Sequence, residues 1–200
     1  MGRRSSHTPQ QLRDLILNAA QEIIESHGLA GLSAREIARR IDYSPGIIYN
    51  MFENLDDVVL HVEARVLEDL EARLSAVARD GDVIDAALRM SSTYLTYAAE
   101  RPQLWNLLFE HHLPKGAPLP PAYQQRFEAL AARIEEVLAP LYPETAVEAC
   151  RQCARALWAS VHGIACLATA DKLSAVTAEN AGQLVEILVR NYLIGAQSSA

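Results

Sequence analysis

Residues 32–52 decide the fold of this chain and read LSAREIARRIDYSPGIIYNMF. Ser33, with Glu36 three residues later, forms a Ser-x-x-Glu capping box that opens a first short helix. Ser44 is a good N-cap for a second one, and Pro45 occupies its first helical position. Two helices of about two turns each bury too little apolar surface to fold alone. The stretch therefore predicts a helix pair joined by a tight corner and supported by helices on either side.

This pair has the outline of a helix-turn-helix, in which the second helix enters the major groove and the first crosses the DNA backbone. An αα-hairpin without a nucleic-acid role has the same outline. Two features favour DNA binding. The second helix carries no charge between Ser44 and Phe52 but presents hydrogen-bonding side chains suited to base edges. The first carries Arg35, Arg39 and Arg40, which suit phosphates.

The flanking segments supply the supporting helices. Thr8-Pro9-Gln10-Gln11 is a second well-formed helix start, and apolar residues recur behind it at helical spacing as far as His27. After the pair, Asn54 caps a long helix that runs to about Ala78, before the break at 79–82. The first helix would seat the pair, and the long one would act as a lever into the next domain.

The rest of the chain predicts helices throughout, and so an all-α fold of about nine helices. The expected segments are Val83–Glu100, a short helix around Leu104–Phe109, Ala122–Ala139, Pro143–Ala170 and Ser174–Ile194. Residues 113–121 hold four prolines and predict a loop. Gly2–His7, with Arg3 and Arg4, is either a disordered tail or a basic arm that reaches DNA.

Composition narrows the class of protein. The formal charge is −7 over 200 residues, but residues 1–54 hold six Lys/Arg against six Asp/Glu, so the excess acidity lies in 55–200. No apolar run is long enough to span a membrane, and no hydrophobic segment follows the polar start. These features predict a soluble, cytoplasmic protein without membrane contact. Three cysteines do not suggest a disulfide framework.

The segment from about Thr8 to Val62 resembles the DNA-binding domain of the TetR family of bacterial regulators. The matching residues include Glu36-Ile37-Ala38 and Ser44-x-Gly46-x-Ile48-Tyr49-x-x-Phe52. The resemblance implies that Ser33 and Tyr49 contact phosphates and that other exposed residues lie at or near bases. The expected DNA-binding residues are Ser33, Arg35, Ser44, Pro45, Gly46, Ile47, Tyr49, Asn50 and Met51.

Three positions depart from the family pattern, each by an apolar replacement. Ile47 stands where Ser or Thr is frequent, Met51 where His or Tyr is frequent, and Leu55 where a phosphate-binding Lys is typical. Ile47 can instead pack on a thymine methyl group, which is a mode of base readout. Loss of the Lys removes one phosphate contact.

The C-terminal part resembles the WHG-type ligand-binding domain of some TetR regulators, through Leu157-Trp158-x-x-Val161-His162-Gly163 and Arg101-Pro102-x-Leu104-Trp105. The resemblance implies a DNA-binding domain at 1–54, with its motif at 33–52, and a ligand-binding and dimerisation domain at 55–200. The implied function is a homodimeric repressor that binds a palindromic double-stranded DNA operator and is released by a small-molecule effector. The expected effector pocket comprises Met90, Tyr94, Tyr97, Trp105, Phe109, His112, Trp158 and His162. The expected dimer interface comprises Leu157, Val161, Ile164, Ala168, Leu184, Ile187, Leu188 and Asn191.

Two rival interpretations come from other classes of protein. An all-helical enzyme or haem-type sensor would use His111, His112, His162 and the cysteines, but no catalytic residue set or phosphate loop supports catalysis. Cys150-x-x-Cys153 has no second pair to complete a zinc site, so buried small side chains are the simpler interpretation. We therefore expect no enzyme activity, no metal and no cofactor. A helical adaptor that has lost DNA binding is the other rival, and Leu55 and Met51 favour it slightly.

Overall fold

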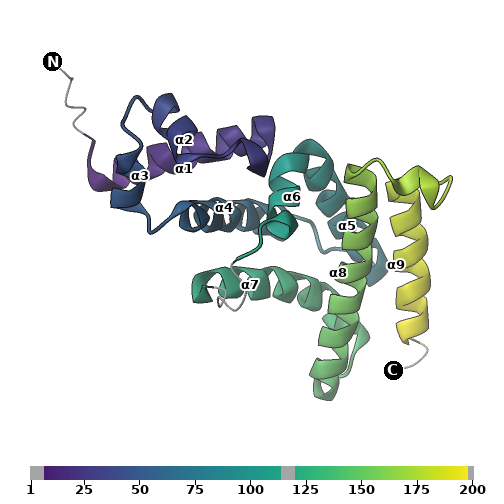
Figure 1. Cartoon of the computed structure of the whole chain (residues 1–200). Coiled ribbons are helices and arrows are strands. Elements are labelled where there is room, and N and C mark those ends of the chain that lie inside the picture. The colour runs from purple at the N-terminus through teal and green to yellow at the C-terminus, as the bar shows by residue number, and fades with distance from the viewer. Residues whose placement is uncertain (1–6, 114–119, 198–200) are drawn as a thin grey trace. The chain divides into compact units, whose positions relative to one another are not determined.

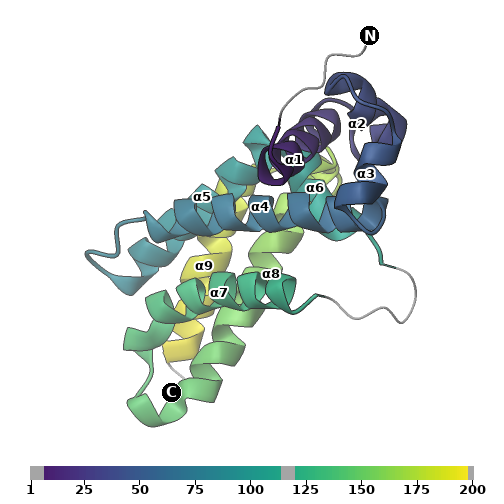
Figure 2. The same cartoon turned by 90° about the vertical axis from the view of Figure 1, so that its left-hand side faces the viewer.

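The computed structural model describes residues 7–113 and 120–197 (Figures 1 and 2). In these residues the chain forms nine α-helices and no strand, which confirms the all-α prediction. The helices are α1 Pro9–His27, α2 Ala34–Arg40, α3 Gly46–Met51, α4 Leu55–Ser75, α5 Val83–Glu100, α6 Pro102–Glu110, α7 Pro121–Leu138, α8 Val147–Thr169 and α9 Ala181–Gln197. Residues 2–6 of the predicted basic arm and residues 114–119 of the predicted loop lie outside the described residues.

The chain divides into two compact units. Unit 1 comprises the described parts of Met1–Val66 and Gln103–Leu119, and unit 2 those of Leu67–Pro102 and Pro120–Ala200. This division differs from the expected boundary at residue 54, because the first part of α4 and most of α6 belong with the helix-turn-helix. Helix α4 is thus shared by the two units.

In unit 1, α1 supports α2 and α3 (Figure 1). The capping box at Thr8 is complete: the Gln11 backbone N–H donates to Thr8 Oγ1 at 3.3 Å, and the Thr8 N–H donates to Gln11 Oε1 at 2.9 Å. The box predicted at Ser33 is half formed. Ser33 Oγ accepts from the Glu36 N–H at 3.2 Å, but the Glu36 carboxylate pairs with Arg39 instead of reaching back.

Three helix starts differ from the prediction. Helix α8 begins at Val147 rather than at Pro143, because Glu144–Ala146 form a separate 3-10 turn. Helix α3 begins at Gly46 with Pro45 as its N-cap, so the Ser44 side chain does not cap it. Helix α9 begins at Ala181 rather than near Ser174, since 173–175 form a separate 3-10 turn. Asn180 explains the later start, because its Oδ1 accepts from the Gln183 N–H at 3.0 Å while Gln183 Oε1 accepts from the Asn180 N–H.

Unit 2 is a helical bundle in which α5 packs on α9, α7 on α8, and α8 on α9 (Figures 1 and 2). Its core holds small and aliphatic side chains together with Tyr94 and Tyr97, both almost fully buried. The alternation of small and large residues lets the helices approach closely. Among the described residues, no helix is both long and apolar enough to cross a membrane.

Candidate DNA-binding surface and effector cavity

Helix α3 is fixed by two buried residues and presents its opposite side to solvent. Ile48 is 0% exposed and Phe52, just after the helix, is 4% exposed. Tyr49, in contrast, is 59% exposed. The other expected contact residues are exposed at Ser33, Arg35, Ser44, Pro45, Gly46 and Asn50 and half-buried at Ile47 and Met51. The local fold therefore brings these nine residues onto α3 and the starts of α2 and α3, with uncharged side chains on α3 itself.

The arginines of α2 are not equivalent. Arg39 Nη2 lies 2.6 Å from Glu36 Oε1, and Arg40 bridges Glu36 and Glu22 at 3.5 and 3.3 Å. Hydrogen bonding from Arg39 is the main reason that the pKa of Glu36 falls to about 2. Arg35 makes no ion pair within the part of the chain that the structure describes, and it is exposed. It is therefore the arginine of α2 that is best placed to meet a phosphate or a base.

Arg13 of α1 holds the end of α3, and sequence reasoning missed it. Its Nη1 donates to the Met51 carbonyl at 2.8 Å, and its guanidinium carbon lies 4.2 Å from the centre of the Phe52 ring. The contact satisfies a carbonyl at the helix end, where no helical N–H is available. Burial and the nearby Arg13 charge both lower the pKa of His61, which lies beside this guanidinium. The sequence signal was an arginine next to Leu12, at the edge of the apolar stripe of α1.

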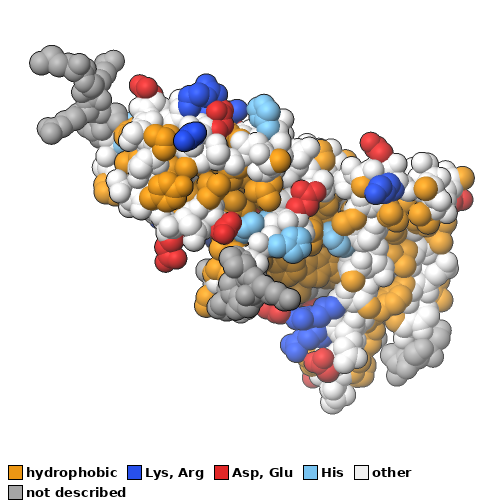
Figure 3. All heavy atoms as spheres, viewed as in Figure 1, with side chains coloured by type: hydrophobic (Ala, Val, Ile, Leu, Met, Phe, Trp, Pro, Cys, Tyr) orange, Lys and Arg blue, Asp and Glu red, His pale blue; other side chains and the backbone are white. Residues whose placement is uncertain are grey.

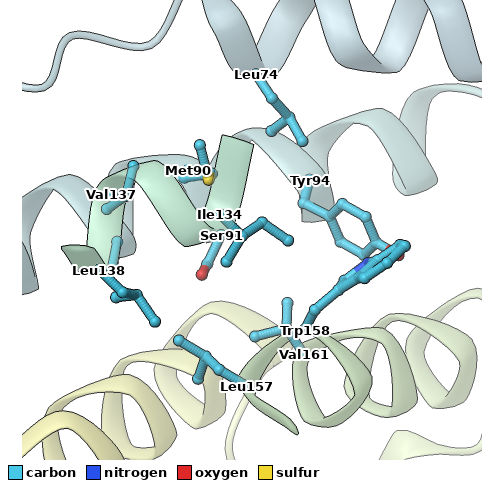
Figure 4. A pocket seen from close by; sticks show the side chains of 11 residues that line it. Leu74, Met90, Ser91, Tyr94, Ile134, Val137, Leu138, Leu157, Trp158 and Val161 are labelled. Carbon is cyan, nitrogen blue, oxygen red and sulfur yellow. The ribbon is translucent and has the colours of Figure 1, made fainter. Parts of the chain in front are cut away.

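Unit 2 contains a cavity enclosed by α4, α5, α7 and α8 (Figure 4). About 30 Å³ of it is open to a water-sized molecule, within a partly open space of about 390 Å³ that includes solvent. The lining residues are Leu74, Ala87, Met90, Ser91, Tyr94, Ile134, Val137, Leu138, Leu157, Trp158 and Val161. Three residues of the expected effector pocket are among them, namely Met90, Tyr94 and Trp158. Most of the wall is hydrocarbon, and no lining side chain is charged.

One end of this cavity is polar. Trp158 Nε1–H donates to the Tyr94 hydroxyl at 3.0 Å, and that oxygen lies 3.1 Å from His162 Nδ1. His162 Nε2 lies 3.2 Å from Cys166 Sγ on the next turn of α8. Burial raises the pKa of Tyr94 and lowers the pKa of His162. The four side chains thus form a hydrogen-bonded network of neutral groups.

Of the five remaining residues of the expected pocket, His162 joins the polar end of the cavity through Tyr94, and the other four lie elsewhere. Tyr97 is fully buried and stacks with Arg73 and Arg101 at 4.9 and 5.9 Å, away from the cavity wall. The other three residues, Trp105, Phe109 and His112, belong to unit 1. Of these three, Trp105 is fully buried, whereas Phe109 is 37% exposed and His112 is exposed. Among the described residues, no group of His, Cys, Asp and Glu has the arrangement needed for a metal ion.

The outer surface of α8 and α9 differs from the expected dimer interface. Leu157, Val161 and Ile164 are buried inside their own unit, and the first two line the cavity. Ala168, Leu184 and Leu188 are half-buried, whereas Ile187 and Asn191 are exposed. The apolar stripe of α8 that the sequence offered as an interface is therefore the side that packs within unit 2.

Comparisons with known proteins agree with this architecture. A sequence model for the tetR family of bacterial regulatory proteins matches residues 16–62, and one for the tetracyclin repressor-like C-terminal domain matches residues 87–192. The chain belongs to the TetR family of transcriptional regulators. The C-terminal match does not specify the WHG subtype, which stays a prediction. TetR regulators are generally DNA-binding proteins rather than enzymes.

Several solved structures share the fold. A protein of unknown function from Rhodococcus sp. RHA1 has a TM-score of 0.74 at 19% identity, covering 97% of this chain and 98% of that one. A tetR-family transcriptional regulator from Streptomyces coelicolor has a TM-score of 0.70 at 16% identity, covering 100% and 84%. The transcriptional regulator FadR from Bacillus subtilis, in complex with stearoyl-CoA, has a TM-score of 0.64 at 12% identity, covering 91% and 98%. No curated protein matches the sequence.

Proposed function

We propose that this TetR regulator is a homodimeric repressor that binds a palindromic operator and is released by a small-molecule effector. The orientation of α3 is the observation that carries the proposal. Ile48 and Phe52 anchor the helix, so Tyr49 and Asn50 face outward together with the N-terminal end at Ser44. A helix that presents uncharged hydrogen-bonding groups from a rigid seat suits base readout in a major groove.

The flanking groups suit the DNA backbone. Ser33 and Tyr49 are exposed and supply hydroxyl groups, and Arg35 supplies a positive charge. Phosphate contacts of this kind fix the register on the duplex, whereas base contacts determine the sequence preference. Since the described part of unit 1 has few cations without an ion-pair partner, we expect the DNA affinity to depend only modestly on salt concentration.

The exposed side of α8 and α9 supports the homodimer. Helix α8 carries small or short residues outward at Ala149, Ala156, Ser160 and Gly163, and α9 exposes Ile187 and Ile194, at 50% and 53%. Figure 3 views this region and shows hydrophobic side chains along α8 and α9. In the proposed dimer these exposed residues take the place of the buried Leu157, Val161 and Ile164, while Ile187 and Asn191 remain contacts. A two-fold axis here would set two α3 helices on half-sites related by a palindrome.

Selection of bound duplexes from a random DNA library tests the proposal. We expect the full-length protein to enrich a palindrome with half-sites about one helical turn apart. Tyr49→Ala should then weaken binding to all duplexes, while Asn50→Ala should relax the preference at one position per half-site. A single base-specific contact typically supplies about 1–3 kcal/mol of discrimination, or roughly tenfold to a hundredfold.

Gln125→Ala is the matched control, because Gln125 is an exposed amide on α7 in unit 2. It should leave both affinity and sequence preference unchanged. Sedimentation at micromolar concentration tests the dimer separately. Enrichment of no motif at any salt concentration would favour the adaptor interpretation over the repressor.

Release by an effector requires that the effector prefers one of two states of the dimer. Helix α4 is suited to connect the two sites, since Leu74 near its C-terminal end lines the cavity while its N-terminal half belongs to unit 1. A compound that binds the cavity and lowers operator affinity would establish this coupling.

A further inference from the structure

We propose that the cavity of unit 2 takes an uncharged, mainly apolar small molecule with one hydrogen-bonding group, and that Tyr94 recognises this group. The inference rests on the proposed function in taking this cavity as the effector site. It goes further by naming the chemical class of the ligand and the residue that selects it.

The wall of the cavity excludes ionised ligands. Eight of the eleven lining residues have purely hydrocarbon or thioether side chains, and the remaining three are Ser91, Tyr94 and Trp158. No carboxylate, guanidinium or ammonium group lines the space to pair with a charge. Transfer of an unpaired ion from water into such surroundings is far more costly than transfer of a hydroxyl that finds a hydrogen bond. A neutral ligand is therefore strongly favoured.

The polar groups lie in two places. Ser91, one turn before Tyr94 on α5, lies beside the aliphatic residues, whereas the Tyr94 hydroxyl lies at the polar end (Figure 4). Trp158 reaches the same hydroxyl from α8, with its indole N–H 3.0 Å from the Tyr94 oxygen. A ligand whose single polar group points to this end satisfies it there, while the rest of the molecule contacts hydrocarbon.

The Tyr94 hydroxyl can bind a ligand group that donates a hydrogen bond or one that accepts it. Its oxygen accepts from the Trp158 indole N–H, and its O–H can donate to His162 Nδ1 when that nitrogen carries no proton. Burial keeps the pKa of Tyr94 above its ordinary value, which leaves the phenol protonated at neutral pH. A ligand alcohol or carbonyl can join by exchanging with one of these bonds, without any change in charge.

The cavity also limits ligand size. The space open to a water-sized molecule is about 30 Å³, well below the range for small-molecule pockets, so only a compact ligand enters without movement of the wall. It suits a compact molecule, and it offers no cation for the phosphates of a nucleotide-bearing ligand. The expected ligand is thus a short aliphatic or small aromatic alcohol, ketone or ester.

Three probes of equal chain length test the charge preference: 1-octanol, octanoate and octylammonium. Each is titrated into the full-length protein at pH 7.5, with calorimetry as the readout. We expect 1-octanol to bind at least tenfold more tightly than either ion. Equal or tighter binding of octanoate or octylammonium, or no binding of any probe, would overturn the proposal.

Two variants test the role of the wall. Tyr94→Phe removes the hydroxyl and should weaken 1-octanol binding about fivefold, the range expected for one neutral hydrogen bond. Ser91→Leu fills the cavity and should weaken 1-octanol binding at least tenfold. Ser92→Leu changes the exposed neighbouring residue and should leave 1-octanol binding unchanged. Thermal unfolding identifies a variant that fails to fold. Tyr94→Phe keeps the ring, so it provides a second test if Ser91→Leu is unstable. Unchanged affinity in a folded Tyr94→Phe variant would contradict the role of Tyr94.

Operator binding, measured with and without 1-octanol, separates this inference from the proposed function. Binding of 1-octanol to the cavity together with loss of operator affinity supports both. Binding of 1-octanol without any effect on operator affinity supports the ligand class but contradicts the effector role. If the protein binds the operator but none of the probes, the proposed DNA-binding function stands and the proposed ligand class is contradicted.

Discussion

Two histidines, one in each unit, occupy contrasting surroundings. In unit 1, the ring of His111 lies 3.1 Å from Glu63 Oε1 through Nδ1 and 3.5 Å from Asp56 Oδ1 through Nε2. In unit 2, His162 lies 3.1 Å from the Tyr94 hydroxyl through Nδ1 and 3.2 Å from the Cys166 thiol through Nε2. The pKa of His111 is raised, chiefly by its hydrogen bond to Glu63, whereas the pKa of His162 is lowered by burial.

The difference shows that the partner, more than the depth of burial, decides the direction in which the pKa of a buried imidazole shifts. Burial also raises the pKa of Glu63, although its hydrogen bond to His111 opposes this shift. Glu63 is 2% exposed and comes from α4, while His111 directly follows α6, so the hydrogen-bonded pair ties these segments together inside unit 1. The network of unit 2 instead borders a space that a ligand can enter, where a neutral molecule can exchange with existing hydrogen bonds.

Removal of the Glu63 side chain should lower the free energy of unfolding more than any other change at these two sites. Glu63→Ala leaves the imidazole of His111 buried without its main partner and opens a gap beside α4. We expect the free energy of unfolding to fall by about 3 kcal/mol, the order found when one member of a buried pair is removed. Urea unfolding at pH 6 measures the loss.

Glu25→Ala is the control for that variant, because Glu25 is an exposed acid on α1 of the same unit. It should change stability by about 0.5 kcal/mol or less. The double variant Glu63→Leu/His111→Leu should recover part of the loss, since apolar replacements need no partner. A loss for Glu63→Ala no larger than for Glu25→Ala would mean that the hydrogen-bonded pair does not hold α6 to α4.

Removal of the Tyr94 hydroxyl, the corresponding change in unit 2, should lower the free energy of unfolding by less. Tyr94→Phe deprives Trp158 and His162 of a shared hydroxyl but strands no charge. We expect a loss of about 1–2 kcal/mol in the free energy of unfolding, the order of an unsatisfied neutral group. Urea unfolding of both variants under the same conditions compares them directly. A larger loss for Tyr94→Phe than for Glu63→Ala would reverse the interpretation of the two sites.

The sequence predicted the helices well because capping residues and apolar spacing are local signals. Thr8 and Gln11 marked the start of α1, and Gly81 lies in the break predicted after α4. The start of α9 was missed although Asn180 and Gln183 form the same kind of local box. The residues before Ala181 instead form a separate 3-10 turn at Leu173–Ala175.

The sites depended on contacts that local patterns do not encode. The pair of Glu63 and His111 joins residues 48 positions apart, and the Arg13 contact with Met51 spans 38. Helical periodicity could tell that Leu157 and Val161 share a face, but not whether that face meets the cavity or a second subunit. Only the packing of α8 against α5 and α7 decides this.

The smallest expected effect is the pH dependence of stability, to which the two histidines should contribute in opposite directions. The raised pKa of His111 means that its contribution to stability is fully present below its ordinary pKa, near 6.5, and is lost as the pH rises through the raised value. The lowered pKa of His162 means the reverse: its contribution is present above about 6.5 and is lost as the pH falls through the lowered value.

NMR titration of the two imidazoles measures both pKa values in one experiment. Glu63→Gln should bring the pKa of His111 down while leaving that of His162 in place, because the two histidines have separate partners. The same variant should lose more stability at pH 6 than at pH 8.5, because the raised pKa of His111 favours the folded state only while the imidazole is protonated. If Glu63→Gln shifted neither pKa, burial alone would set the charge of His111, and the contrast between the two units would disappear.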